Sequence, residues 1–263
     1  MKNDAAYNSD SLAYETVEQG TSAISRSSAY VIFPERKRRY AYAFFKRLFD
    51  IVMSVLALIV LSPTFLVTAV AIKSDSKGPV LYSQSRAGKD GKSFKMYKFR
   101  SMCVDADEKL KGLQHLNEKD GPVFKISNDP RVTKIGRFIR KVSIDELPQL
   151  INIVKGDMSI VGPRPLMMQY LSRYSPDQAR RHEVKPGITG WAQINGRNAI
   201  SWENKFKLDV WYVDNWTFWL DMKIIFKSFW MVIAKEGITQ QGRATMDEFM
   251  GTPQNDTIKH TQR

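Results

Sequence analysis

Residues 48–72 read LFDIVMSVLALIVLSPTFLVTAVAI, an apolar stretch with Ser62-Pro63 near its middle. About 20 apolar residues suffice to cross a bilayer, and only this stretch of the sequence is long enough. Pro63 removes a backbone donor and clashes with the preceding turn, while the Ser62 hydroxyl can bond a carbonyl that the break sets free. The stretch therefore predicts either a re-entrant helix-break-helix or a kinked span, since proline is tolerated in spanning helices.

Basic residues flank both ends of this stretch, and they bear on the choice between a re-entrant segment and a kinked span. Lys46 and Arg47 precede it, after the basic run at 36–39, and Lys73 and Lys77 follow it. Basic residues near membrane ends tend to stay cytoplasmic. Two basic flanks favour the re-entrant form, although the flanks alone leave the span open.

The charge balance of the whole chain points to an acidic partner. The 263 residues carry a formal net charge of +13, which indicates anionic lipid, a phosphate-bearing substrate or nucleic acid. The single cysteine, Cys103, excludes an intrachain disulfide. Three histidines and one cysteine at unrelated spacings predict no zinc site.

Four regions follow from composition. Residues 1–33 predict a disordered polar tail, 34–73 a basic approach with the membrane hairpin, 74–240 a catalytic domain, and 241–263 a flexible tail. Within the domain, breakers such as Asp90-Gly91 predict short strands and turns over 78–102. Five tryptophans fall in 202–235, which predicts amphipathic helices in the membrane interface, with aromatic core helices as the alternative.

The central part of the chain predicts two helices joined by an acidic pair. Residues 131–142 have helical periodicity, and Ser143-Ile-Asp-Glu146 has the spacing of a capping box for the next helix. Asp145-Glu146 is thus a helix cap on the simplest interpretation. The surrounding cations favour a catalytic role over a simple cap, because an ionised carboxylate among arginines can act as a nucleophile or a metal ligand toward a phosphate.

Other cations have a structural and a functional interpretation. Arg164 lies between two prolines in GPRP (162–165), which suits bidentate phosphate binding, although a solvated arginine is the more usual outcome. Lys98 and Arg100 alternate with aromatics, as in a strand with a solvated charged face. Gly196-Arg197-Asn198 predicts a turn that presents another arginine. These residues indicate a membrane enzyme or binder that acts on phosphates at the cytoplasmic surface.

Four blocks of this sequence resemble the bacterial sugar transferases, the monotopic phosphoglycosyl transferases that act on polyprenyl phosphate. The resemblance covers about residues 44–240, and its last two blocks are long and specific. The blocks are KRLFDIV…LSP (46–63), GPVLYSQSRAGKDGKSFKMYKFRSM (78–102), DPRVTKIGRFIRKVSIDELPQLINIVKGDMSIVGPRPL (129–166) and RHEVKPGITGWAQINGRNAISWENKFKLDVWYV (181–213).

The resemblance implies a fold, a reaction and a set of roles. The fold would be an α/β monotopic membrane protein with a re-entrant break at Ser62-Pro63, interface helices and a small catalytic domain facing the cytoplasm at the inner membrane. The reaction would move a sugar-1-phosphate from a UDP-sugar to undecaprenyl phosphate and release UMP, as the first membrane step of a surface polysaccharide or glycoconjugate pathway. Asp145 would be the covalent nucleophile and Glu146 its partner, with Mg²⁺ on Asp145 and the diphosphate. The phosphates and UMP would bind Lys98, Arg140, Arg164 and Arg197.

A non-catalytic basic protein that docks on anionic lipid or nucleic acid is the alternative function. It would not need a specific carboxylate pair, and the sequence has no RNA-binding motif, so no nucleic-acid partner is expected. The sequence does not name the sugar: glucose, galactose and N-acetylated hexosamines stay open. The oligomeric state stays open too, a homo-oligomer included.

Overall fold

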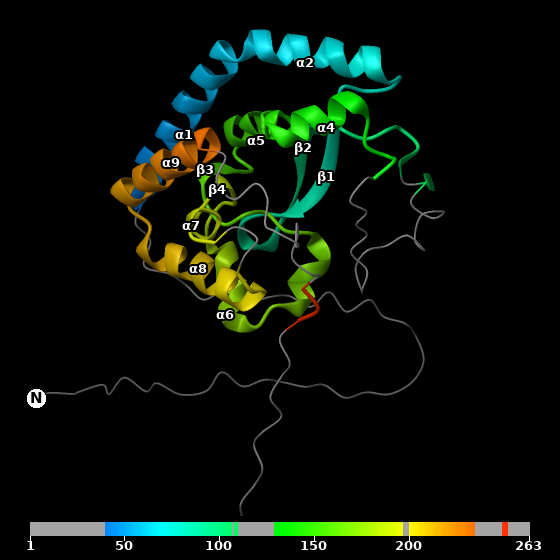
Figure 1. Cartoon of the computed structure of the whole chain (residues 1–263). Helices are drawn as coiled ribbons and strands as arrows, with labels where there is room; N and C mark the ends of the chain where they lie inside the picture. Colours follow the sequence, from blue (N-terminus) through cyan, green and yellow to red (C-terminus); the bar gives the residue numbers. More distant parts are fainter. Residues whose placement is uncertain (1–39, 107, 110–128, 197–199, 235–248, 252–263) are drawn as a thin grey trace, which may run out of the picture. The chain divides into compact units, whose positions relative to one another are not determined.

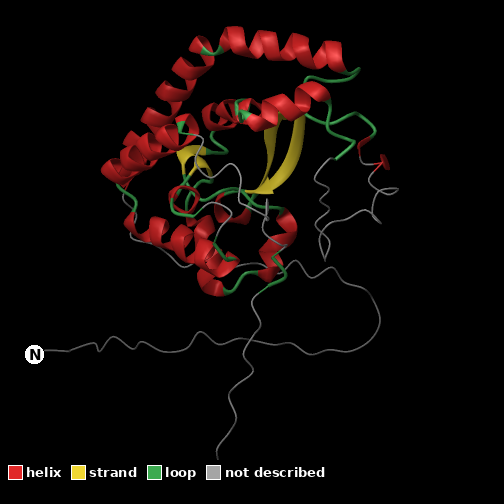
Figure 2. Cartoon of the chain, in the orientation of Figure 1, coloured by secondary structure: helices red, strands yellow, loops and turns green. Residues whose placement is uncertain are grey.

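The computed structural model describes residues 40–106, 108–109, 129–196, 200–234 and 249–251. All of them belong to a compact unit that comprises residues 31–263. Helices predominate and enclose a few short strands (Figure 2), so the predicted mixed α/β class is confirmed. The division into tails, membrane hairpin and catalytic domain stays a prediction, because the tails lie almost wholly outside the described residues.

The helices lie on three sides of the strands in Figure 1. Their bounds are α1 Tyr40–Val60, α2 Ser62–Asp75, α4 Lys134–Lys141, α5 Gln149–Lys155, α6 Pro176–Ala179, α7 Trp191–Ile194, α8 Trp202–Asn215 and α9 Phe218–Ile233. The described residues also contain four short 3-10 segments, of which η3 carries the acidic pair: η1 Lys89–Gly91, η3 Ile144–Glu146, η4 Met168–Arg173 and η5 Arg180–Glu183.

The first 3-10 segment, η1, forms the turn of a β-hairpin. Strands β1 (Leu81–Ala87) and β2 (Ser93–Phe99) pair antiparallel from Leu81↔Phe99 to Ala87↔Ser93. Asp90 and Gly91 have positive φ angles of 55° and 68°, which suits a tight hairpin turn. The strands and turns predicted for 78–102 are therefore confirmed.

A second, shorter sheet connects the chain segments that follow the acidic pair. Strands β3 (Ser159–Val161) and β4 (Gly187–Thr189) run parallel, with Ser159 opposite Gly187. A Cβ atom on Gly187 would come within 2.1 Å of the Gly162 nitrogen, so the two backbones approach closely only because these positions are glycines. This contact fixes the start of the GPRP loop.

Helices α1 and α2 meet at a sharp bend. The predicted break lies at Ser62-Pro63: the Ser62 hydroxyl donates to the Ile59 carbonyl at 2.8 Å, and Pro63 occupies the first turn of α2. Among the described residues, no single helix is long and apolar enough to cross a membrane, but Tyr42–Val60 and Ser62–Asp75 meet the length and composition criteria together, with a bend of 60°. The helix break is confirmed, whereas the membrane itself stays a proposal.

One side of α1 is fixed to the rest of the molecule by polar contacts. Arg47 donates to the carbonyls of Ile153 and Val154 at the end of α5. Lys46 pairs with Asp221 of α9 at 2.5 Å, and α9 lies beside α1 in Figure 1. These contacts hold the N-terminal helix against α5 and α9.

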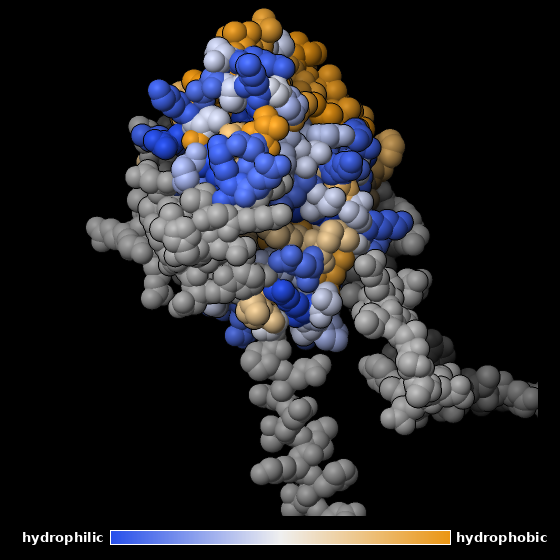
Figure 3. Space-filling model, turned by 90° about the vertical axis from the view of Figure 1, so that its right-hand side faces the viewer, coloured by the Kyte–Doolittle hydropathy of each residue, from blue (hydrophilic) through white to orange (hydrophobic). Residues whose placement is uncertain are grey.

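The opposite side of α1, together with α2 and α9, exposes apolar side chains. Of the 24 large hydrophobic side chains that are exposed among the described residues, 17 belong to these three helices. Figure 3 shows apolar residues along the upper edge of the molecule, where α2 lies. Soluble monomers rarely expose an apolar surface of this extent. The face is therefore built to contact an apolar medium or partner.

The tryptophan-rich segment forms α8 and α9. The core-helix interpretation fits one of these helices and the interface-helix interpretation fits the other. Trp202 packs beside a buried cluster that includes Phe206, as expected of a core helix. In α9, Ile224 is fully buried, while Trp219 and Trp230 are 79% and 65% exposed. The core alternative thus describes α8, and α9 has the amphipathic character predicted for an interface helix.

Candidate active site

The acidic pair lies on η3, the short turn between α4 and α5. Ser143 has a left-handed conformation (φ 59°, ψ 17°) and its side chain caps no helix. The predicted capping box is therefore wrong: the chain reverses at Ser143, and α5 starts only after Pro148. Because a left-handed residue is costly without glycine, this reversal is held by its surroundings, and it turns Asp145 toward the interior of a cavity.

Glu146 is held by two cations from distant parts of the sequence. Lys98 of β2 donates to Glu146 Oε1 at 2.8 Å, and Arg164 of the GPRP loop donates to the same oxygen at 2.7 Å. Arg164 also reaches Oε2 at 3.4 Å. The Arg164 side chain is 43% exposed, so it is partly solvated as the structural interpretation expected, but this ion pair orients its guanidinium.

Asp145 contrasts with its neighbour, because no other residue that the structure describes donates a hydrogen bond to its carboxylate. Lys98 Nζ lies 3.9 Å from Asp145 Oδ2, beyond hydrogen-bond distance. The side chain is largely buried, with 12% exposed. Asp145 thus presents to a cation-rich cavity a carboxylate that accepts no hydrogen bond from the described residues.

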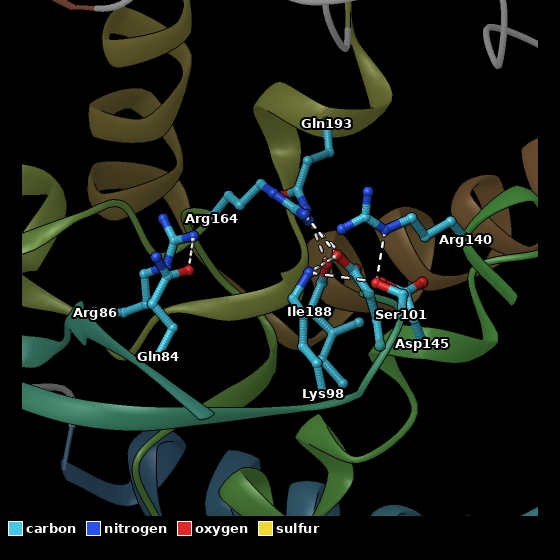
Figure 4. A network of polar contacts seen from close by, with 10 residues as sticks. Gln84, Arg86, Lys98, Ser101, Arg140, Asp145, Arg164, Ile188 and Gln193 are labelled. Atoms are coloured by element: carbon cyan, nitrogen blue, oxygen red, sulfur yellow. Dashed lines mark hydrogen bonds and ion pairs between the residues drawn. The ribbon is translucent and has the colours of Figure 1, made fainter. Parts of the chain in front are cut away.

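Arg140 completes the group from the last turn of α4. Its Nε donates to Ser101 Oγ at 2.7 Å, as Figure 4 shows. The position of Ser101 is fixed by close contact with α4, since a Cβ on Gly136 would lie 2.0 Å from the Ser101 carbonyl oxygen. The hydrogen bond to Ser101 fixes one edge of the Arg140 guanidinium, and the other guanidinium nitrogens can bind a ligand.

The environments of the two carboxyl groups move their pKa values apart. Burial raises the pKa of Asp145, and the Lys98 charge opposes this shift without cancelling it. Burial acts in the same direction on Glu146, but the charges and hydrogen bonds of Arg164 and Lys98 outweigh it and hold the pKa of Glu146 well below its usual range. Paired groups with diverging pKa values often divide roles in catalysis.

The cavity around this group has a volume of about 1390 Å³. Its walls carry apolar residues of α1 and α9, such as Met53 and Met231, as well as the charged group around Asp145. A ligand with both an apolar and an anionic part would find complementary surfaces there.

The sequence-predicted site residues can now be placed. The structure brings Lys98, Arg140 and Arg164 together with the acidic pair, while their roles stay predictions. Arg197 lies outside the described residues. Arg100, taken as part of a solvated strand face, is buried and donates to the carbonyls of Ser76 and Lys77, so that interpretation is wrong because the arginine closes the end of α2.

Sequence reasoning missed several residues of the same cavity. Ser101 positions Arg140, and Arg86 of β1 and Lys205 of α8 also line the cavity. Arg86 lies in one of the blocks that carry the family resemblance, but nothing in its local pattern separates it from an ordinary strand arginine. Lys205 lies 60 positions from Asp145 (205 − 145), and only the fold brings it near.

The residues present fit a divalent cation that takes most of its ligands from a substrate. Among the described residues, no group of three or more His, Cys, Asp or Glu side chains could form a metal site. Asp145 offers a free carboxylate, which suits Mg²⁺ because this ion retains waters and binds through one or two carboxylates plus substrate phosphates.

Comparison with known proteins identifies the family. The family model described as bacterial sugar transferase matches residues 41–235. The uncharacterised sugar transferase EpsL of Bacillus subtilis (strain 168) is 51% identical over 207 residues, which are 79% of this chain and 96% of that protein.

Two further relatives are longer proteins. The undecaprenyl-phosphate galactose phosphotransferase of Salmonella typhimurium is 46% identical over 201 residues, 74% of this chain and 41% of that protein. The UDP-glucose:undecaprenyl-phosphate glucose-1-phosphate transferase of Escherichia coli (strain K12) is 43% identical over 189 residues, 69% of this chain and 38% of that protein. This chain thus spans about two fifths of their length. The match over most of its own length shows that the chain belongs to the bacterial sugar transferase family.

Proposed function

We propose that the protein is a phosphoglycosyl transferase that moves a sugar-1-phosphate from a UDP-sugar to undecaprenyl phosphate and releases UMP. The observation that carries this proposal is the free carboxylate of Asp145 beside Lys98, Arg140 and Arg164. A nucleophile that attacks a phosphate must overcome charge repulsion, and flanking cations lower that barrier. The activities named for the relatives from Salmonella typhimurium and Escherichia coli support the same reaction.

The reaction would proceed in two displacements at one phosphorus atom. An oxygen of Asp145 forms a bond to the β-phosphorus of the UDP-sugar, while the bond from that phosphorus to the bridging oxygen breaks and its electron pair leaves with UMP. A phosphate oxygen of undecaprenyl phosphate then attacks the same phosphorus and releases Asp145 as a carboxylate. Lys98 and Arg140 would neutralise the charge on the transferred phosphate.

Glu146 would serve as an anchor in this scheme. Its two ion pairs hold Lys98 and Arg164 at the edge of the cavity, so the cations need not reorganise when the substrate arrives. Preorganised charges of this kind stabilise transition states without an added entropy cost. Its lowered pKa keeps Glu146 ionised throughout.

A magnesium ion would be held by Asp145 and the substrate diphosphate. When bound, the ion would neutralise phosphate charge as a Lewis acid. We expect EDTA to stop the reaction and added Mg²⁺ to restore it, with Ca²⁺ as the comparison ion. Undiminished turnover in EDTA would rule the metal out.

We further propose that α1 and α2 form a re-entrant hairpin in the cytoplasmic membrane of a bacterium, with the catalytic residues on the cytoplasmic side. The 60° bend and the exposed apolar faces of α1, α2 and α9 support this arrangement. Anionic lipids would contact the basic flanks. The step would begin a surface polysaccharide or glycoconjugate pathway, in which the identity of the sugar is open and no nucleic acid takes part.

The topology has a direct test. Cysteines introduced at Asn8 and Lys207, in a Cys103→Ser background, should both resist an impermeant thiol reagent added to intact cells. Replacing Ser62 and Pro63 with leucine and alanine should straighten the helix, so that part of the population is labelled at position 207 and activity falls. Labelling at position 207 without these replacements would show that the segment is a plain span.

The reaction is tested by incubating the purified full-length protein with undecaprenyl phosphate and a panel of UDP-sugars. UMP should appear with at least one sugar, and mass spectrometry before acceptor addition should detect a phosphosugar adduct on Asp145. Absence of UMP with every UDP-sugar would overturn the proposed function. Turnover without an adduct under rapid quenching would overturn the covalent step alone.

A further inference from the structure

The cavity holds more positive charge than its carboxylates can neutralise. Among the described residues that line it, the carboxylates are Asp145 and Glu146, whereas eight side chains are cationic. Those eight are Arg86, Lys98, Arg100, Arg131, Arg140, Lys141, Arg164 and Lys205. An excess of cations along one cavity favours an anion that carries more charge than one phosphate.

Two of these cations have their charge satisfied within the protein. Arg131 forms an ion pair with Asp129 at 2.7 Å, and Arg100 donates to main-chain carbonyls at the end of α2. Both are structural contacts. Lys98 and Arg164 pair with Glu146, so the other cations that line the cavity are Arg86, Arg140, Lys141 and Lys205.

Arg86 is the clearest member of this surplus. Its Nη2 donates to the neutral amide oxygen of Gln84 at 2.7 Å, and its buried Nε has no hydrogen-bond partner among the described residues. Burial and the neighbouring Arg164 lower the pKa of Arg86. A guanidinium that lies beside another arginine, and whose hydrogen-bond partner in the described part of the chain is a neutral amide, can receive an anion.

Lys205 lines the same cavity from α8 and lies close enough to Arg164 for the two charges to interact. Its Nζ lies over the Trp202 ring, 4.7 Å from the centroid, and Trp202 contacts Tyr170 edge to face, with centroids 6.0 Å apart. Tyr170 lines the cavity and interacts with Arg86. Burial lowers the pKa of Lys205 to about 8, although Asp209 opposes the shift.

Arg164 separates two groups of side chains in Figure 4. Arg86 and Gln84 lie on one side of it, whereas Arg140, Ser101 and Asp145 lie on the other. A diphosphate places its two phosphorus atoms on either side of one bridging oxygen. If one phosphate lies at Asp145, the other lies toward Arg164 and the group beyond it.

We propose that Arg86 and Lys205 form a second phosphate subsite, across Arg164 from Asp145, that holds the phosphate of the departing nucleoside monophosphate. This inference rests on the proposed function, in which the bond between the β-phosphorus and the bridging oxygen breaks and the electron pair leaves on that oxygen. Cations at this position stabilise the charge that develops there. They also bind the released product.

Product binding tests the subsite without turnover. The purified full-length protein in detergent should bind UMP more tightly than uridine in isothermal titration calorimetry. Arg86→Gln and Lys205→Gln should each weaken UMP binding by about tenfold or more, the effect expected for a lost charge-assisted hydrogen bond, and leave uridine binding unchanged. Arg86→Lys, which keeps the charge, should recover part of the affinity.

Two exposed lysines provide matched controls. Lys95→Gln on β2, the strand paired with that of Arg86, and Lys207→Gln on α8, the helix of Lys205, remove a charge at exposed positions, and both variants should bind UMP as the unmodified protein does. Circular dichroism should show that every variant is folded. UMP affinities within twofold of the controls for both Arg86→Gln and Lys205→Gln would overturn the subsite, as would equal affinity of the unmodified protein for UMP and uridine.

The outcomes separate this inference from the proposed function. If the unmodified protein releases UMP from a UDP-sugar but the Arg86 and Lys205 variants bind UMP normally, only the subsite is wrong. If no UDP-sugar yields UMP, the proposed function is wrong, whatever the binding results. Asp145→Asn, which should not turn over, should still bind UMP and so measures the subsite on its own.

Discussion

Two groups of charged side chains differ in how their positive and negative charges balance. Around Asp145 and Glu146 the cations outnumber the carboxylates, and one carboxylate has no close partner. In the other group Arg181 and Asp209 meet one to one at 2.8 Å, with 1% and 3% of their side chains exposed. The first group opens on a cavity, and the second is enclosed by the rings of Tyr174 and Phe206.

The difference separates a structural ion pair from a site. Arg181 donates two hydrogen bonds to Asp209, one to the Arg164 carbonyl and a longer one, at 3.5 Å, to the Tyr174 hydroxyl. It thereby holds the loop that carries Arg164 into the cavity. The balanced Arg181–Asp209 pair stabilises the backbone, whereas the excess of cations around Asp145 and Glu146 can bind an anionic ligand. Substitutions in the two groups should therefore affect different measurements.

The largest expected effect is on catalysis, from Asp145→Asn. The amide is nearly isosteric but cannot act as the nucleophile, so turnover should fall by about a thousandfold or more, equivalent to about 4 kcal/mol in barrier height. Stability should change little, because burial disfavours the ionised carboxyl, as its raised pKa shows. UMP release and thermal unfolding measure the two effects, and full activity in this variant would contradict the assigned role.

Asp209→Asn should act on stability instead. Removing one partner of a buried ion pair leaves the other charge unpaired and costs about 3–5 kcal/mol. Urea unfolding followed by tryptophan fluorescence would measure the loss. Asp214→Asn is the matched control, because the Arg180–Asp214 pair is at the surface and such pairs contribute at most about 1 kcal/mol. Equal losses for the two variants would remove the distinction between the groups.

Glu146→Gln should have an intermediate effect on activity. Lys98 and Arg164 would lose the charge that orients them, and we expect kcat to fall by about 10- to 100-fold, or about 1.4–2.7 kcal/mol. Glu203→Gln removes an exposed carboxylate paired with Lys207 and should leave kcat unchanged. A Glu146→Gln enzyme with normal kcat would show that the anchor is dispensable.

The smallest effect concerns pH. Asp145 must be ionised to attack, so kcat/KM should decline as the pH falls through its pKa, and burial places that decline above the ordinary value of about 3.9. The Glu146 charge also raises the pKa of Asp145, so Glu146→Gln should move the decline to lower pH. Profiles of kcat/KM against pH for both enzymes test this; a shift toward higher pH would contradict the stated electrostatics.

Local patterns predicted the elements and part of the site. Asp90-Gly91 marked the hairpin turn, the periodicity of 131–142 anticipated α4, and Ser62-Pro63 located the bend, because each depends on neighbouring residues. The approach of Lys98 and Arg164 to Glu146 was expected only from the family resemblance, since no local pattern encodes contacts across 48 and 18 positions.

The remaining features depend on tertiary contacts. The S-x-x-E spacing at Ser143 suggested a cap, but contacts around η3 impose a left-handed turn instead. Arg100 looked like a solvated strand residue because its carbonyl partners at the end of α2 lie more than 20 positions earlier. Arg86 and Lys205 were missed for the same reason: their significance arises from the charges around them in the folded chain.

The anchoring of α1 has a consequence for the order in which the protein folds. Lys46 and Arg47 leave the ribosome early, yet their partners are Asp221 and the carbonyls of Ile153 and Val154, separated from them by 106 to 175 positions. Contacts of such long range form slowly, because the intervening chain must first be made and its loops closed. The first described helix to be synthesised is therefore among the last to complete its polar contacts, and α9 must emerge before that helix is secured.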